Sequence, residues 1–123
     1  MLILKMEEHD YLALDQALNK MIVEGRVLEA FEIFYDESVV MQENDNDPIL
    51  GKDANRDREF EFMDGITELR NAEVLSTGAG ENITFSHWRY DFTHKDWGVS
   101  QYRQVAIRTW KHGRIIREVF HYG

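Results

Sequence analysis

The sequence predicts an α+β fold, with helices in its first half and an antiparallel sheet in its second half. Two observations support this prediction. Up to about residue 64, apolar residues recur at steps of three and four, which is typical of amphipathic helices. From Ile66 onward, apolar and aromatic residues alternate with a period of two, which is typical of strands. Helices that precede a sheet, rather than alternate with its strands, indicate an α+β architecture, and 123 residues fit one domain, 1–123.

The first two helices are expected on either side of Gly25. The first runs from about Glu7 to Glu24 and the second from about Arg26 to Tyr35. Their apolar stripes consist of Tyr11, Leu14, Leu18, Met21 and Ile22 in the first helix, and of Val27, Leu28, Phe31, Phe34 and Tyr35 in the second. Because glycine commonly ends a helix, a junction this short makes the two helices neighbours.

A short strand, a polar turn and a third helix are expected next. The strand covers Ser38 to Gln42 and is rich in β-branched and apolar residues, and the turn contains Pro48. The third helix spans Lys52 to Asp64, with Asp53 as its N-cap and Gly65 at its end.

Four strands with short connections complete the predicted fold. They are expected at Ile66 to Ser76, Ile83 to Thr93, Val99 to Trp110 and Ile115 to Tyr122. The segments between them are short and rich in glycine and polar residues, as hairpin turns require. We therefore expect a meander in which every neighbouring pair of these strands is antiparallel.

Composition limits the partners of the protein. The chain has 23 acidic and 14 basic residues, a formal net charge of -9, so it repels phosphate backbones and no nucleic-acid role is expected. Its opening apolar run is too short for an export signal or a membrane span, so we expect no membrane association and a cytoplasmic location. The absence of cysteine fits a reducing compartment.

No metal or cofactor is expected. The five histidines show neither the i, i+4 pair nor the His-x-His spacing of common metal sites, and no thiolate is available. Gly78 and Gly80 lie in a predicted hairpin connection, which lacks the strand-loop-helix setting of a phosphate-binding loop.

Three segments resemble the nuclear transport factor 2-like superfamily, and its SnoaL-like members in particular. Glu24–Phe31 is similar to the link between the superfamily's first two helices, and Tyr35–Val40 to its helix-to-strand step. The ending Trp110–Tyr122 is similar to the closing hairpin of SnoaL-like members. The resemblance implies a cystatin-like α+β cone, in which a curved antiparallel sheet wraps around three helices and encloses a cavity.

The same resemblance implies a homodimer with a small organic molecule in the cavity. The superfamily includes cyclases, isomerases, dehydratases and non-catalytic transport or assembly domains, so the fold does not assign a reaction. One hypothesis is a cofactor-independent isomerase, cyclase or dehydratase. The other is a non-catalytic ligand-binding or assembly domain, whose cavity is filled by aromatic side chains.

Glu118 and Arg108 are the candidate catalytic residues. The resemblance of the last hairpin implies that its even-numbered positions face the cavity. Apolar neighbours would favour the protonated form of Glu118, which suits a general acid or base. Arg108 lies across the same hairpin. The two side chains could form a salt bridge, or Arg108 could present its planar fork to a carboxylate or enolate of the ligand.

Other polar and aromatic residues on this face are the candidate ligand contacts. They are Trp88, Tyr90, Tyr102, Gln104, Phe120 and Tyr122. The aromatic members could equally be ordinary core residues. A single β-bulge would exchange the two faces of the sheet and bring Gln101, Arg103, Arg117 and His121 inside instead.

The positions of known catalytic residues allow two specific reactions to be compared with this sequence. In ketosteroid isomerases the catalytic aspartates would fall at Gln42 and at Ala106 or Ile107, so the resemblance does not extend to that chemistry. Dehydration of the scytalone dehydratase kind would need a histidine and an aspartate in the cavity, for which His87 and Asp91 are the nearest candidates.

The outer face of the sheet is the expected dimer interface. With the even-numbered residues facing inward, five apolar residues would be exposed together on a monomer: Val99, Val105, Ile107, Ile115 and Val119. A second copy of the chain would bury them.

Overall fold

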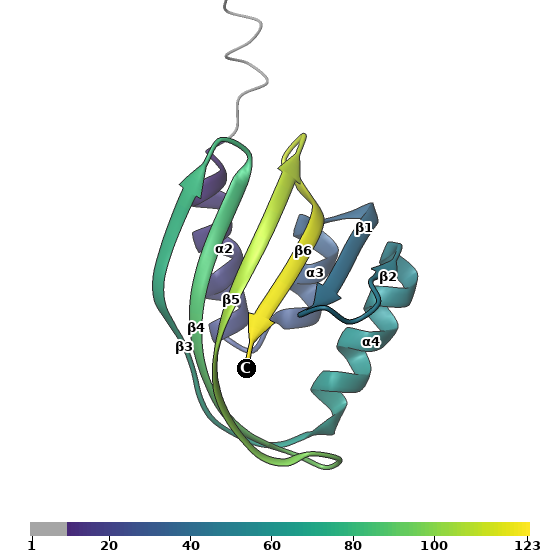
Figure 1. Cartoon of the computed structure of the whole chain (residues 1–123), viewed down its shortest axis with the longest axis vertical. Helices are drawn as coiled ribbons and strands as arrows, with labels where there is room; N and C mark the ends of the chain where they lie inside the picture. The colour runs from purple at the N-terminus through teal and green to yellow at the C-terminus, as the bar shows by residue number, and fades with distance from the viewer. Residues whose placement is uncertain (1–9) are drawn as a thin grey trace, which may run out of the picture.

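The computed structural model describes residues 10–123, which form three helices and six strands (Figure 1). The helices are α2 (Tyr11–Val23), α3 (Val27–Phe34) and α4 (Lys52–Gly65). The strands are β1 (Tyr35–Glu43), β2 (Ile49–Leu50), β3 (Ile66–Gly80), β4 (Ile83–His94), β5 (Gly98–Lys111) and β6 (Arg114–Tyr122). The start predicted for the first helix, at Glu7, lies outside the described residues. Within residues 10–123, no helix combines the length and apolar character needed to cross a membrane.

The strands form one mixed sheet in the order β2-β1-β6-β5-β4-β3. Strands β3 to β6 make the predicted meander, with antiparallel pairing throughout. The prediction of a fully antiparallel sheet is wrong, because β1 pairs in parallel with β6. A parallel pair requires a long connection, and here α4 and the meander supply it. The sheet remains open, with β2 and β3 at its two edges.

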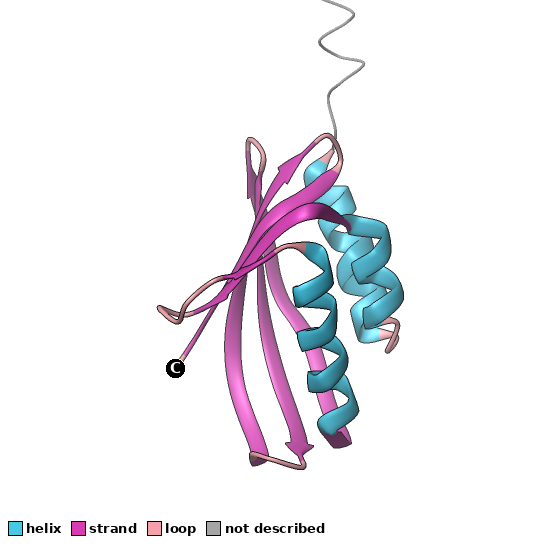
Figure 2. Cartoon of the chain, turned by 90° about the vertical axis from the view of Figure 1, so that its right-hand side faces the viewer, coloured by secondary structure: helices cyan, strands magenta, loops and turns pink. Residues whose placement is uncertain are grey.

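All three helices cover the same face of this sheet (Figure 2). Strands β3, β4 and β5 bend at their lower ends toward α4, so the sheet curves around the helices (Figure 1). The core between the two layers consists mainly of Leu18, Ala30, Phe31, Phe34, Val39, Met41, Trp110 and Ile115. This arrangement confirms the α+β prediction of helices packed on a curved sheet.

Two helix ends differ from the predictions. Tyr35 is extended (φ -99°, ψ 134°) and begins β1, so the second helix ends one residue earlier than expected. Helix α4 begins after Gly51, whose φ of 91° favours glycine, and no side chain caps it. Asp53 forms an ion pair with Arg56 instead of acting as the N-cap. The buried Asn55 ties α4 to the preceding chain, since its Nδ2 donates to the carbonyl oxygens of Ile49 (3.0 Å) and Gly51 (2.8 Å).

A β-bulge changes one residue of the predicted outer face. In the closing hairpin Thr109 pairs with Arg117 and Trp110 pairs with Ile115, which leaves Ile116 as an extra residue. Ile115 therefore lies on the inner face and is fully buried. Its predicted place on the outer face is wrong.

Candidate functional site

A cavity of about 140 Å³ lies between the helices and the inner face of the sheet. Residues from all three helices and from strands β1, β3, β4, β5 and β6 line it. Its polar wall is formed by Glu43, Arg58, Glu59, Gln104, Arg108 and Glu118. The remaining wall is mostly aliphatic and aromatic, so a few polar groups converge on an apolar space, as is usual in small-molecule sites.

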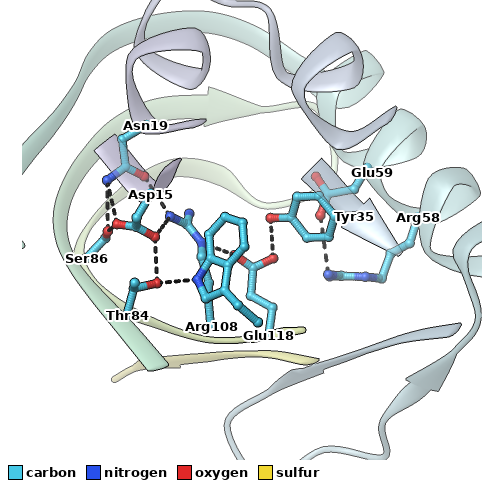
Figure 3. Close-up of polar contacts among 10 residues, drawn as sticks. Asp15, Asn19, Tyr35, Arg58, Glu59, Thr84, Ser86, Arg108 and Glu118 are labelled. Atoms are coloured by element: carbon cyan, nitrogen blue, oxygen red, sulfur yellow. Dashed lines mark hydrogen bonds and ion pairs between the residues drawn. The ribbon is translucent and has the colours of Figure 1, made fainter. Parts of the chain in front are cut away.

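Arg108 lies between two buried carboxylates (Figure 3). Its Nε donates to Oε2 of Glu118 at 2.7 Å, and its Nη1 donates to Oδ1 of Asp15 at 2.7 Å. Nη1 also donates to Oδ1 of Asn19 at 2.7 Å. Burial alone would lower the pKa of Arg108, but the neighbouring negative charges have the larger effect. The pKa is therefore raised, and the guanidinium stays charged.

Hydrogen bonds from three polar side chains fix Asp15 in place. Thr84 donates to its Oδ1 at 2.8 Å, Ser86 donates to its Oδ2, and Asn19 donates to the same Oδ2 at 3.2 Å. The indole nitrogen of Trp110 in turn donates to Thr84 at 2.8 Å. A buried carboxylate with this many donors is well satisfied, so Asp15 is a structural anchor for Arg108.

Glu118 has both oxygens occupied. Its Oε2 accepts from Arg108, and its Oε1 accepts from the hydroxyl of Tyr35 at 2.6 Å. Burial raises the pKa of Tyr35, and the charge of Glu118 adds to that effect. The salt bridge between Arg108 and Glu118 confirms one of the two alternatives drawn from the sequence. The planar fork of Arg108 is not free to bind a ligand carboxylate, because Nε and Nη1 are already engaged.

A second and looser charge cluster lies on the helix side of the cavity. Arg58 Nη1 is 3.2 Å from Oε1 of Glu43, and Arg58 Nη2 is 3.5 Å from Oε1 of Glu59. The side chain of Glu59 is only 17 % exposed. Burial raises the pKa of Glu59 to about 7, Arg58 opposes that shift, and the charges of Glu118 and Glu43 add to it. Glu59 therefore exchanges a proton near neutral pH.

Aromatic rings form much of the opposite wall. Tyr90 lies 5.6 Å from Tyr102 between ring centroids, and Tyr102 lies 5.9 Å from Phe92 in an edge-to-face contact. All three residues line the cavity. Burial raises the pKa of both Tyr90 and Tyr102, so their hydroxyls stay protonated and serve as hydrogen-bond donors.

The structure brings most of the predicted site residues together. Arg108, Glu118, Tyr90, Tyr102, Gln104 and Phe120 all line the cavity. Trp88 is fully buried and stacks on Tyr90 at 5.3 Å, so it packs as a core residue behind the cavity wall. The ring of Tyr122 lies 5.3 Å from that of Tyr102 at a tilt of 36°, and Tyr122 does not belong to the lining.

His87 and Asp91 do not reach the cavity. They occupy the face of β4 opposite to that of Tyr90 and Phe92, and Asp91 pairs with Arg70 at 2.8 Å. The structure thus gives no support to dehydration of the scytalone dehydratase kind. Residues 10–123 contain no group of three or more His, Asp or Glu side chains placed to hold a metal ion.

Sequence reasoning missed Asp15, Tyr35 and Glu59. Asp15 and Asn19 are four residues apart on α2 and follow Leu14 and Leu18, so two polar residues adjoin an apolar stripe. Glu59 precedes Phe62 by three residues, which places both on one side of α4. These spacings are the signals that could have identified the additional carboxylates.

Among known proteins, only solved structures are found to be similar to this chain. No protein-family model and no curated protein matches the sequence. A proposed SnoaL-like polyketide cyclase from Mesorhizobium loti matches with a TM-score of 0.83 and 19% identity, over 93% of this chain and 100% of that one. A nuclear transport factor 2-like protein of unknown function from Burkholderia pseudomallei matches with a TM-score of 0.79 and 11% identity, over 94% of this chain and 92% of that one.

A third match is a proposed isomerase from Rhodopseudomonas palustris, with a TM-score of 0.65 and 16% identity, over 94% of this chain and 90% of that one. The chain thus has the nuclear transport factor 2-like fold. The resemblance inferred from the sequence is confirmed at the level of the fold.

Proposed function

We propose that the protein binds a small organic molecule in its cavity and catalyses a cofactor-independent isomerisation, cyclisation or dehydration there. Reactions of these three kinds need a group that takes or gives a proton near neutral pH. Glu59 is the observation that carries the proposal, because it lines the cavity and its pKa is raised to about 7. Structural neighbours named as a SnoaL-like polyketide cyclase and as an isomerase support the choice of reaction class.

Arg108 and Glu118 act in this proposal as a fixed polar wall. Nε and Nη1 of Arg108 hold the two carboxylates, whereas Nη2 has no hydrogen-bond partner within residues 10–123. Arg108 lines the cavity, so Nη2 is available to donate to a ligand oxygen. Tyr90, Tyr102 and Phe120 contribute the apolar and aromatic contacts of the ligand.

The second candidate is a non-catalytic ligand-binding or assembly domain. One observation favours it: the innermost carboxylates, Asp15 and Glu118, are fully paired and have no oxygen free for a proton transfer. In that case Glu59 would serve binding alone. A test for a general base therefore separates the two candidates.

Ring opening of 5-nitrobenzisoxazole provides this test without knowledge of the substrate. A base removes the carbon-bound proton of this neutral aromatic probe, the nitrogen–oxygen bond breaks, and a coloured phenolate forms. We expect the rate to rise with pH through about 7, as Glu59 becomes ionised. Glu59→Gln should lower the rate roughly 100-fold, the size of a general-base contribution.

Glu61→Gln is the matched control, since Glu61 is exposed on the same helix and does not line the cavity. It should retain the rate of the unmodified protein. A rate that is unchanged in Glu59→Gln would contradict the catalytic proposal and leave the non-catalytic candidate.

We also propose that the protein is a cytoplasmic homodimer that associates through the outer face of the sheet. Phe85, Ile107 and Val119 lie in register across β4, β5 and β6, and Phe85 is 42% exposed. Val99 is 69% exposed, and Val105 is half-buried on the same strand face as Ile107. Pairing of two copies would remove this apolar row from water.

Sedimentation equilibrium tests the dimer. A species of twice 14.6 kDa is expected, and Ile107→Glu should convert it to the monomer, because two charges would be buried at a two-fold interface. Leu50→Glu is the control, since Leu50 is 70% exposed on the short strand β2. A 14.6 kDa species for the unmodified protein would refute the proposal.

A further inference from the structure

The charges of the cavity wall do not balance. Two guanidinium groups, of Arg58 and Arg108, line the cavity together with three carboxylates, and Arg108 is also paired with Asp15, which lies behind the lining. Arg108 lies between Asp15 and Glu118, at 2.7 Å from each, and Arg58 lies between Glu43 and Glu59. With every carboxylate ionised, the lining has a formal excess of one negative charge, or of two when Asp15 is counted with it. An anionic ligand would find no uncompensated positive charge in this cavity.

A polar side chain without a partner marks where a ligand binds. Gln104 is 8% exposed and lines the cavity, yet its side-chain amide makes no hydrogen bond to any part of residues 10–123. The amide nitrogen and oxygen are open to the cavity rather than fully shielded, so a bound molecule can take up their hydrogen bonds. The amide can both donate and accept, which suits a hydroxyl group.

Aromatic rings complete the surroundings. Phe62, Tyr90, Phe92 and Tyr102 line the same cavity. The faces of such rings carry negative partial charge and attract organic cations, above all when water is excluded. Negative wall charge and aromatic rings thus favour the same kind of ligand.

We propose that the ligand is a small organic cation, an amine or quaternary ammonium compound, which binds with its charge near Glu59 and Glu43 and a hydroxyl group on Gln104. This inference rests on the proposed binding function and names its ligand class. The size of the cavity, about 140 Å³, limits the ligand to a few heavy atoms beyond the charged head.

Proton exchange at Glu59 supports the same ligand class. Its charged neighbours are Arg58 on its own helix, Glu43 on β1 and Glu118 on β6. Without a ligand, protonation of Glu59 lowers the excess negative charge by one, and a bound cation would take the place of that proton. Affinity for a permanent cation is therefore expected to rise with pH through about 7, the pKa of Glu59, and to fall below it.

Three probes of nearly identical shape and different charge test the proposal. They are choline, with its trimethylammonium head, and two tert-butyl compounds, neutral 3,3-dimethyl-1-butanol and anionic 3,3-dimethylbutanoate. Each is titrated into the full chain and followed by NMR at the signals of the cavity wall. Choline should bind roughly tenfold more tightly than the alcohol at pH 8, and the butanoate should not bind.

Variants test the proposed contact of the cation with Glu59 and the proposed contact of the hydroxyl group with Gln104. Glu59→Gln should remove the pH dependence of choline binding, whereas Glu61→Gln should retain it. Gln104→Leu should weaken choline but leave tetramethylammonium, which has no hydroxyl, unchanged.

Equal or tighter binding of the alcohol or the butanoate at the cavity would overturn the cation proposal and leave the proposed binding function intact. Choline shifts confined to the protein surface would overturn it as well. If none of the three probes shifts a cavity signal while ring opening of 5-nitrobenzisoxazole depends on Glu59, the cation proposal alone fails. If that reaction is absent too, the proposed function fails with it.

Discussion

The two arginines of the cavity wall lie in contrasting surroundings. Arg108 is 2% exposed and its two carboxylate contacts measure 2.7 Å each. Arg58 is 24% exposed and its two contacts measure 3.2 and 3.5 Å. The inner cluster joins α2, β5 and β6 through short buried hydrogen bonds, whereas the outer cluster leaves Glu59 able to exchange a proton. Under the proposed function, the inner cluster stabilises the fold and the outer cluster takes part in the chemistry.

Arg108→Met should have the largest effect on stability. The substitution leaves Asp15 and Glu118 buried without a countercharge, which costs about 3–5 kcal/mol of unfolding free energy. Urea denaturation measures the loss. If Arg108→Met is as stable as the unmodified protein, the inner cluster does not hold the fold together.

Tyr35→Phe should have an intermediate effect. The change removes the hydroxyl that donates to Glu118, a hydrogen bond to a charged group worth about 1.5–3 kcal/mol. Tyr90→Phe is the control in the same denaturation experiment, because the Tyr90 hydroxyl has no hydrogen-bond partner within residues 10–123. Equal losses in the two variants would show that the bond to Glu118 contributes nothing specific.

Arg58→Met should have the smallest effect on stability, at most about 1 kcal/mol, since partly exposed ion pairs contribute little. Its effect on chemistry should be clear, because Arg58 lowers the pKa of Glu59. The pH profile for ring opening of 5-nitrobenzisoxazole should therefore move to higher pH in this variant. A profile that moves to lower pH would contradict the assigned role.

Local patterns were sufficient to predict the helices and the meander. The first two helices and the four strands depend on the spacing of their own apolar residues, and the hairpin turns are short. The pairing of β1 with β6 could not be predicted in this way, because it joins residues far apart in the chain, such as Met41 and Glu118, which are 77 positions apart. The two residues of β2 are too few to show any period.

The candidate site was predictable only where it depends on local patterns. Alternation along β5 and β6 placed Arg108 and Glu118 on one face, and their pairing followed from the hairpin. The roles of Asp15 and Glu59 depend on how α2 and α4 pack against the sheet, which alternation does not determine. The bulge at Ile116 is likewise set by packing and moved Ile115 inward.

A carboxyl NMR titration of Glu59 tests the central claim most directly. The side-chain carboxyl carbons are labelled and followed from pH 4 to pH 9, and the signal of Glu59 is assigned with Glu59→Gln. The account predicts a midpoint at about 7, because the carboxyl is buried beside Glu118 and Glu43. A midpoint at the ordinary glutamate value of about 4.3 would contradict it, since Glu59 would then be fully ionised at neutral pH.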